Sequence, residues 1–128
     1  MVVLMARDGS EMIGHVIAFA LTFAIASLVP AKNAAQETKV VEIAAERFTF
    51  TPSEIRVKAG TRLEIRLRSD DTAHGFRIIG TDVNVELPKR GRGVATVTFE
   101  PQPGRYTFEC SQLCGAGHEF MRGVIIAE

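Results

Sequence analysis

The sequence predicts an all-β fold, a β-sandwich, preceded by one apolar N-terminal helix. From residue 39 onward, hydrophobic and polar residues alternate in short runs, as they do in half-buried strands. Turn-forming residues interrupt these runs at short spacing, and no convincing helical pattern appears among them. Many short strands separated by turns are typical of a sandwich. The 128 residues are enough for one such domain and not for two.

The N-terminal helix is expected over residues 13–29, a stretch without any charged residue that Pro30 ends. Its length is at the short edge of what spans a bilayer, so the segment is either a membrane anchor or the apolar part of a secretory signal. The flanking charges decide little between them, because Asp8 and Glu11 offset Arg7. We favour a single anchor over a cleaved signal.

Both alternatives place the rest of the chain outside the cytoplasm. We therefore expect a single-pass protein of the cell membrane, with its folded domain on the periplasmic or extracytoplasmic side. Residues 1–35 would form the anchor or signal segment with its tether, and residues 36–128 the β domain. Basic and acidic residues balance at 15 each, so the basic footprint of a nucleic-acid-binding protein is missing.

Alternation places the expected strands in order along the β domain. The clearest is residues 62–68, where three aliphatic side chains alternate with four charged ones; the arginines on its outer face are most simply solvated. The full set is residues 39–45, 47–51, 55–58, 62–68, 75–79, 83–87, 94–99, 106–110 and 123–127.

The chemistry is concentrated near the C-terminus, in the pattern Cys-x3-Cys-x3-His-x2-Met formed by Cys110, Cys114, His118 and Met121. These are the only two cysteines of the chain. Thiolate and thioether are soft ligands that suit copper(I), and imidazole suits copper in either oxidation state. Cys110 ends a strand whose alternate residues look core-like, so its side chain should point inward.

Three simpler explanations compete with a copper pair. A Cys110–Cys114 disulfide is geometrically possible in an exported protein, but it would constrain little chain and leave the histidine and methionine unexplained. Methionine is not a usual zinc ligand. A mononuclear blue copper centre takes one cysteine, and this loop supplies two.

Two thiolates fit best if both bridge two copper ions. Each copper then needs an imidazole. His118 supplies one, and His74 is the candidate for the other, since His15 lies in the N-terminal apolar stretch. Asp70 and Asp71, just before His74, are candidates to accept a hydrogen bond from a ligand imidazole, although turn formation explains them equally well.

With these residues, the chain resembles the copper-A domain of subunit II of haem–copper cytochrome c oxidases, most closely the small, single-anchor subunit II of the ba3 type. The resemblance covers residues 48–127 and rests on residues 74–76 (His-Gly-Phe), 80–86 and 110–121. It implies a cupredoxin-like Greek-key β-sandwich. It also implies a role for each ligand. Cys110 and Cys114 would bridge two coppers, with His74 and Met121 completing one and His118 and the carbonyl of Gln112 the other.

Gln112 departs from the many family members that have Glu there, whose side chain also reaches a magnesium or manganese ion. An amide is a poorer ligand for such a hard cation, so we expect no second metal. In nitrous oxide reductase, the other copper-A family, Trp occupies this position, so Gln112 favours the oxidase.

The function implied is electron transfer from cytochrome c, through the copper pair, to haem in subunit I, with no catalysis by this chain alone. The alternative is a stand-alone exported copper-A-like cupredoxin that carries electrons or delivers copper. Trp is absent and the charges balance, so we expect docking of the donor to be more apolar and less salt-dependent than that of strongly steered pairs. Phe76 and Phe120 are candidates for an aromatic near the site, with a core role favoured for Phe76.

Overall fold

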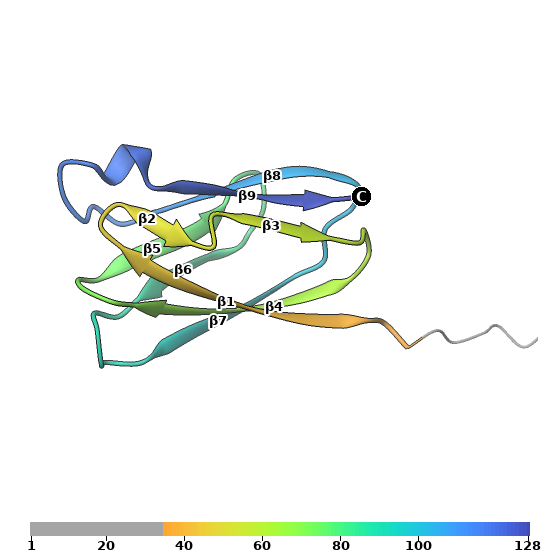
Figure 1. Cartoon of the computed structure of the whole chain (residues 1–128), viewed down its shortest axis with the longest axis horizontal. Helices are drawn as coiled ribbons and strands as arrows, with labels where there is room; N and C mark the ends of the chain where they lie inside the picture. Colours follow the sequence, from red (N-terminus) through yellow and green to blue (C-terminus); the bar gives the residue numbers. More distant parts are fainter. Residues whose placement is uncertain (1–34) are drawn as a thin grey trace, which may run out of the picture. The chain divides into compact units, whose positions relative to one another are not determined.

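The computed structural model describes residues 35–128, which form two β-sheets packed face to face (Figure 1). The helix expected over residues 13–29 lies outside the described residues. Within residues 35–128, no helix is long and apolar enough to cross a membrane.

One sheet has four strands and the other has five. The first runs in the order β2 (Thr49–Thr51), β1 (Thr38–Glu46), β4 (Arg62–Ser69) and β7 (Val94–Phe99). The second runs in the order β3 (Glu54–Val57), β9 (Arg122–Ala127), β8 (Gly104–Glu109), β5 (His74–Ile78) and β6 (Asn84–Leu87). The pairs β1–β4 and β3–β9 are parallel, and the other neighbours are antiparallel.

The all-β sandwich is therefore confirmed, and each expected strand has a counterpart within a few residues. Alternation predicts the sides correctly as well: in β4, Leu63, Ile65 and Leu67 are fully buried, whereas Arg66 and Arg68 are exposed. Two differences concern the connection between β8 and β9. Strand β8 ends at Glu109, one residue before Cys110, and a 3-10 turn, η1 (His118–Phe120), interrupts the loop.

An aromatic cluster fills the centre of the sandwich. The rings of Phe50, Phe76 and Phe108 lie within 5.2–5.8 Å of one another, centroid to centroid, and two of the three pairs are edge-to-face. Each ring is at most 2% exposed. The core role expected for Phe76 is thus confirmed. Such ring pairs add roughly 0.5–1.5 kcal/mol each beyond the area they bury.

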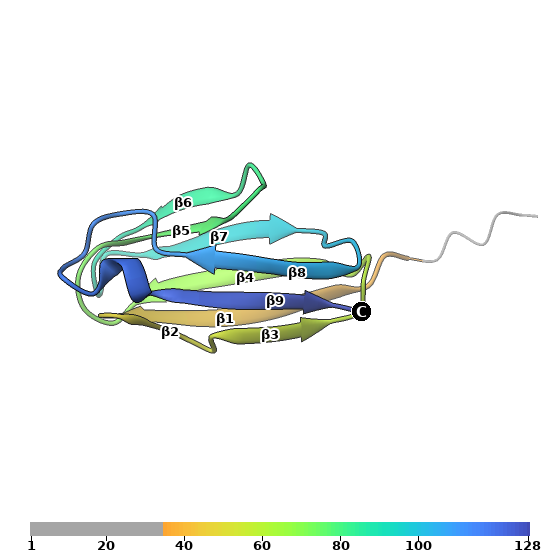
Figure 2. The same ribbon diagram turned by 90° about the horizontal axis from the view of Figure 1, so that it is seen from above.

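Four loops gather at one end of the sandwich, opposite the C-terminus (Figure 2). They connect β1 to β2, β4 to β5, β6 to β7, and β8 to β9. Loops held by a rigid sheet are a common place for functional side chains. The expected copper ligands lie at this end, which we call the ligand end.

Replacing Phe108 with Ala should lower the free energy of unfolding by about 3–5 kcal/mol, because the change opens a cavity in the middle of the core. Phe120→Ala is the control, since this ring is 75% exposed and should change stability by no more than about 0.5 kcal/mol. Urea denaturation of the metal-free protein measures both. Equal losses for the two variants would contradict the central position of Phe108.

Candidate metal centre

His74 is the first residue of β5, and its side chain is fully buried. It pairs across the sheet with Leu87, which is also fully buried. A buried imidazole without polar partners would be costly, so the interactions of its two ring nitrogens explain why it is tolerated there.

The other expected ligands lie on residues 110–121, which we call the ligand loop. Its two ends are joined by a hydrogen bond from the amide of Cys110 to the carbonyl of Met121, 3.0 Å long. Cys110, Cys114 and Met121 are buried, whereas Gln112 and His118 are half-buried. The loop therefore turns its sulfur atoms into the sandwich.

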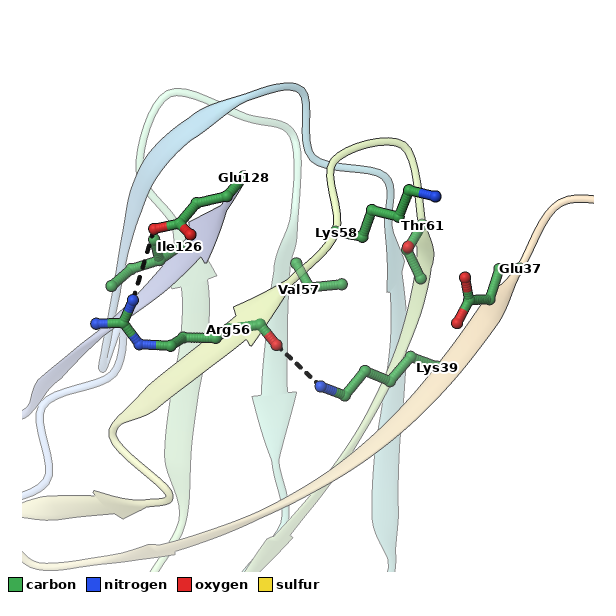
Figure 3. A pocket seen from close by; sticks show the side chains of 8 residues that line it. All are labelled: Glu37, Lys39, Arg56, Val57, Lys58, Thr61, Ile126 and Glu128. Carbon is green, nitrogen blue, oxygen red and sulfur yellow. Dashed lines mark hydrogen bonds and ion pairs between the residues drawn. The ribbon is translucent and has the colours of Figure 1, made fainter.

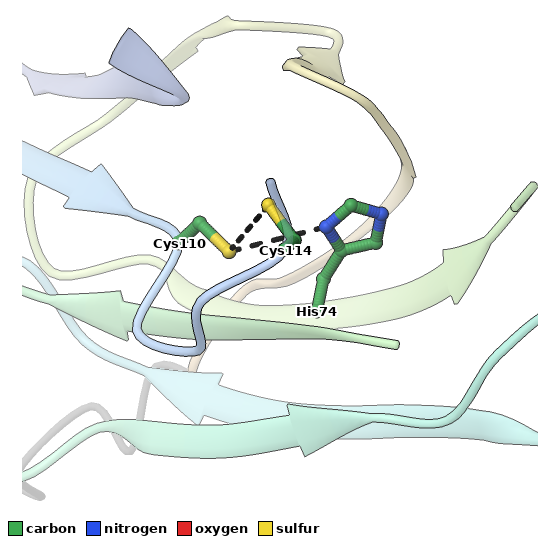
Figure 4. A group of neighbouring side chains, drawn as sticks. All are labelled: His74, Cys110 and Cys114. Carbon is green, nitrogen blue, oxygen red and sulfur yellow. Dashed lines mark hydrogen bonds between the residues drawn. The ribbon is translucent and has the colours of Figure 1, made fainter. Parts of the chain in front are cut away.

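The sulfur atoms of Cys110 and Cys114 lie 3.8 Å apart, and no disulfide joins them (Figure 4). This separation is far longer than the S–S bond of a disulfide, about 2.05 Å. The competing explanation of a Cys110–Cys114 disulfide thus does not describe this structure. Together with His74, the two cysteines offer ligand atoms that all lie within 4.8 Å of one another.

Each sulfur has one imidazole and one weaker donor beside it. Cys110 Sγ lies 3.9 Å from His74 Nδ1 and 3.1 Å from the carbonyl oxygen of Gln112. Cys114 Sγ lies 3.8 Å from His118 Nδ1 and 4.0 Å from the thioether sulfur of Met121. All six residues expected as ligands thus lie together. The set of two thiols, two imidazoles, a thioether and a carbonyl fits copper and fits zinc poorly.

Asp71 holds the imidazole of His74 from the side opposite the thiols. Its Oδ1 lies 2.6 Å from His74 Nε2, and its Oδ2 accepts a hydrogen bond from the amide of Arg47. Because an ionised carboxylate only accepts, Nε2 carries the hydrogen in the neutral imidazole, which leaves Nδ1 as the acceptor on the side of Cys110. Asp70 instead pairs with Arg68. Of the two candidate aspartates, the structure selects Asp71.

The charge of Asp71 is maintained by the same contacts. Burial alone would raise the pKa of this carboxyl, but hydrogen bonds from His74 and from the backbone of Arg47 and Thr72 hold the pKa below its usual value of 3.8. The acceptor for His74 is therefore ionised throughout the physiological pH range.

The β1–β2 turn holds the middle of the ligand loop. Arg47 donates from Nε to the carbonyl of Cys114 over 2.8 Å. The ring of Phe48 lies against two glycines: a Cβ at Gly115 would be 2.9 Å from Phe48 Cζ, and one at Gly117 would be 2.6 Å from Phe48 Cγ. Only residues without a side chain allow this approach. The alternation pattern, which places Phe48 in the expected strand 47–51, gives no sign of this contact.

Gly75 explains why glycine follows His74. A Cβ at this position would lie 2.7 Å from the backbone nitrogen of Gln112, closer than real Cβ atoms approach. The absence of a side chain lets the first turn of the ligand loop lie directly against β5. That turn carries the carbonyl of Gln112, the donor nearest Cys110 Sγ.

Burial raises the pKa of the Cys114 thiol from its usual 9.0 to about 11, and the neighbouring Cys110 and the negative charge of Asp71 push it in the same direction. The positive charge of Arg47 opposes this shift. At neutral pH the metal-free site therefore holds a proton on Cys114, and a metal must displace that proton to bind the sulfur.

Asp71→Asn should weaken copper(I) binding by about 10- to 100-fold, because the partner of a ligand imidazole loses its charge. Asp70→Asn is the matched control: it removes the same charge one residue away, where the carboxylate contacts Arg68 and not His74. Competition with a chromogenic copper(I) chelator measures both affinities. Similar losses for the two variants would rule out a specific role for Asp71.

In metal-free Cys110→Ser, ultraviolet titration of the one remaining thiolate should give a pKa for Cys114 between 9.0 and about 11. Burial, the largest cause of the shift, persists in this variant, whereas the effects of Cys110 are lost. Adding Arg47→Gln should raise the pKa further, because a stabilising positive charge disappears. A pKa at or below 9.0 in the single variant would contradict the burial argument.

Comparisons with known proteins identify the fold family. Residues 15–127 match the family model for the cupredoxin-like domain. Over 88 residues, the chain is 35% identical to cytochrome c oxidase subunit 2 of Thermus thermophilus; the match covers 69% of this chain and 64% of that protein. Against a second cytochrome c oxidase subunit 2 of Thermus thermophilus, the identity is again 35%, and 52% of that protein is covered. The chain thus spans between half and two-thirds of these relatives.

Comparison with solved structures agrees with these sequence matches. A chain from a heme-copper terminal oxidase dimer matches with a TM-score of 0.59 at 34% identity, covering 70% of this chain and 65% of that one. The periplasmic domain of subunit II of cytochrome oxidase from Bradyrhizobium japonicum matches with a TM-score of 0.62, covering 70% of this chain and 83% of that domain. Its identity is 17%, so this second likeness supports the fold alone. The chain belongs to the cupredoxin-like domain family and is similar to subunit II of haem–copper oxidases.

Proposed function

We propose that this chain is the electron-transfer subunit, subunit II, of a haem–copper cytochrome c oxidase. In this proposal a binuclear copper centre accepts electrons from cytochrome c and passes them to haem in subunit I. The observation that carries the proposal is the pair of buried sulfurs, 3.8 Å apart, with one imidazole beside each. The 35% identity to the Thermus thermophilus subunit supports the assignment to an oxidase.

The positions of the weaker donors support two copper ions. In the pair His74 and Met121, His74 lies beside Cys110 Sγ and Met121 lies beside Cys114 Sγ. In the other pair, the Gln112 carbonyl lies beside Cys110 Sγ and His118 lies beside Cys114 Sγ. Either donor pair could therefore complete a metal held by both thiolates, one with His74 and Met121 and the other with His118 and the Gln112 carbonyl. A mononuclear centre would leave one of these donor pairs unused.

When bound, a copper pair bridged by two thiolates supplies a one-electron acceptor whose charge is shared over several atoms. The chain's own residues keep the surroundings fixed: Asp71 orients one imidazole, Arg47 holds the carbonyl of Cys114, and Phe48 packs on the ligand loop. With copper bound, the site would relay one electron at a time from the donor to subunit I, with no net change in the chain's own residues. Rigid, largely buried ligands should keep the reorganisation cost of each transfer low.

The remaining parts of the proposal concern the protein's place in the cell. We place the β domain on the periplasmic or extracytoplasmic side of the membrane, anchored through residues 13–29, whose apolar sequence supports this. We propose no magnesium or manganese ion at Gln112, since an amide replaces a carboxylate there.

Copper reconstitution tests the centre directly. The full chain should bind two copper ions and give a purple species with a seven-line hyperfine pattern in its EPR spectrum, because the unpaired electron is shared equally by two copper nuclei. Cys114→Ser should abolish this species, whereas Met121→Leu should keep it and mainly shift its reduction potential. A colourless protein, or a blue one with a single copper, would refute the binuclear assignment.

Purification from membranes tests the assignment to an oxidase. The tagged chain should copurify with a haem-containing subunit. If it holds two coppers but no haem subunit accompanies it, the stand-alone carrier or copper-delivery protein becomes the better assignment.

A further inference from the structure

The loop between β6 and β7, residues 88–93, carries three cations and no carboxylate, and we call it the basic loop. Lys89, Arg90 and Arg92 are all exposed. Among residues 35–128, none of the three takes part in an ion pair. Their charges are therefore not cancelled locally, and their field extends into solvent to about the Debye length.

The basic loop lies beside the candidate metal centre. Strand β6 ends at Leu87, opposite His74, so the loop begins next to the first ligand. The amide of Arg90 donates to the carbonyl of Asp71 over 3.1 Å, and the side chain of Asp71 holds His74. A single residue thus separates the backbone of the basic loop from a ligand imidazole. Figures 1 and 2 show the basic loop and the ligand loop at the same end of the sandwich.

Some of the other charged side chains at the ligand end have partners of their own. Arg68 pairs with Asp70, and Arg47 is bound to the carbonyl of Cys114 and, through its amide, to Asp71. The exposed carboxylates of Glu46, Glu86 and Glu119 take part in no ion pair among the described residues. Glu46 ends β1 and Glu119 lies in η1, whereas Glu86 lies on β6, three residues before Lys89. Residues 86–93 still carry a net charge of +2, because three cations stand against the one carboxylate of Glu86.

Large apolar side chains are exposed on the ligand loop and next to the basic loop. Leu113 is 80% exposed, Phe120 is 75% exposed, and Val94, directly after the basic loop, is 63% exposed. Protein–protein interfaces combine a less polar centre with a polar rim. The ligand end offers both, with the rim charged positively on the side of residues 88–93.

We infer that the basic loop is a docking surface for an electron-donor protein whose face around its own redox group is acidic. This inference rests on the proposed function, because it assumes that electrons arrive at the ligand end. Opposite charges on the two faces would steer the encounter and fix the orientation of the complex, raising the association rate more than the final affinity. The neutral total charge of the chain predicts a weak salt dependence of docking, whereas the proposed basic surface predicts a strong one.

The opposite end of the sandwich supplies the control. It contains a depression of about 370 Å³ (Figure 3). Two cations there are already bound: Lys39 donates to the carbonyl of Arg56, whose guanidinium pairs with Glu54 and Glu128. Three further cations at this end, outside any ion pair among the described residues, are Lys58, Arg62 and Arg105.

The test compares two triple variants of the full chain with the same change in net charge. One is Lys89→Glu, Arg90→Glu, Arg92→Glu; the control is Lys58→Glu, Arg62→Glu, Arg105→Glu. The probes are a c-type cytochrome with an acidic haem-edge face and one with a lysine-rich face. Titration calorimetry measures binding to the metal-free chain, and stopped-flow absorbance measures electron transfer to the copper-loaded chain, both between about 0.01 M and 0.15 M salt.

The acidic cytochrome should bind the wild type and reduce it with a rate constant that falls about 10-fold over this salt range. The basic-loop variant should lose about 10-fold at low salt and most of the salt dependence, while the control variant stays within about 3-fold of wild type. Equal effects of the two triple variants would overturn the proposal, since net charge alone would explain them. A preference of the wild type for the lysine-rich cytochrome would overturn it as well.

A sedimentation assay on the same variants tests whether the basic loop binds anionic membranes instead. Sedimentation with phosphatidylglycerol vesicles should not depend on the basic loop; vesicle binding lost only in the basic-loop variant, with cytochrome binding unchanged, would overturn the proposal. Failure of the proposed function has a different signature. A wild type without a copper pair that still binds the acidic cytochrome through residues 88–93 would refute the copper centre and leave the docking surface standing.

Discussion

The shared carboxylate of Asp71 is the interaction on which the geometry of the site depends. One oxygen holds the imidazole of His74, and the other accepts from the amide of Arg47. The same residue's carbonyl accepts from Arg90. Three of the four loops at the ligand end therefore meet at a single side chain and its backbone. Because a hydrogen bond to an ionised acceptor is roughly twice as strong as a neutral one, this junction fixes their relative positions.

The fourth loop, which carries five of the six expected ligands, is fixed by its neighbours more than by its own secondary structure. The amide of Cys110 and the carbonyl of Met121 close its base, Arg47 holds its middle, and Gly75 lets its first turn lie on β5. Only the short turn η1 is regular. Such a loop keeps one conformation only if its neighbours hold it closely. This explains why other residues approach the backbone closely at several glycines in and around it.

Much of this arrangement could be predicted from the sequence because its signals are local. The alternation of hydrophobic and polar residues predicts the strands, and the spacing from Cys110 to Met121 is specific enough to predict a set of ligands. His74 could be found from the chemistry, since two thiolates and one imidazole need a second imidazole. The choice between Asp70 and Asp71 could not be predicted, because it depends on the direction in which the turn after β4 points each side chain.

The contacts of Arg47 and Phe48 could not be predicted either, for a different reason. They join a two-residue turn to a loop 67 residues further along the chain, and such a contact leaves no periodicity in either segment. The charge of residues 88–93 is visible in the sequence, but its meaning depends on the pairing of His74 with Leu87, which places the loop at the ligand end.

The protonation of the Cys114 thiol connects the stability of the domain with its chemistry. Burying a neutral thiol costs little, whereas burying an unpaired thiolate would cost several kcal/mol. The raised pKa of Cys114 means that the metal-free domain buries the neutral form at physiological pH. The sandwich can therefore fold around its aromatic cluster before any metal arrives, unlike small zinc domains that fold only with their ion. At physiological pH, negative charge on the sulfur of Cys114 therefore requires a cation that displaces its proton.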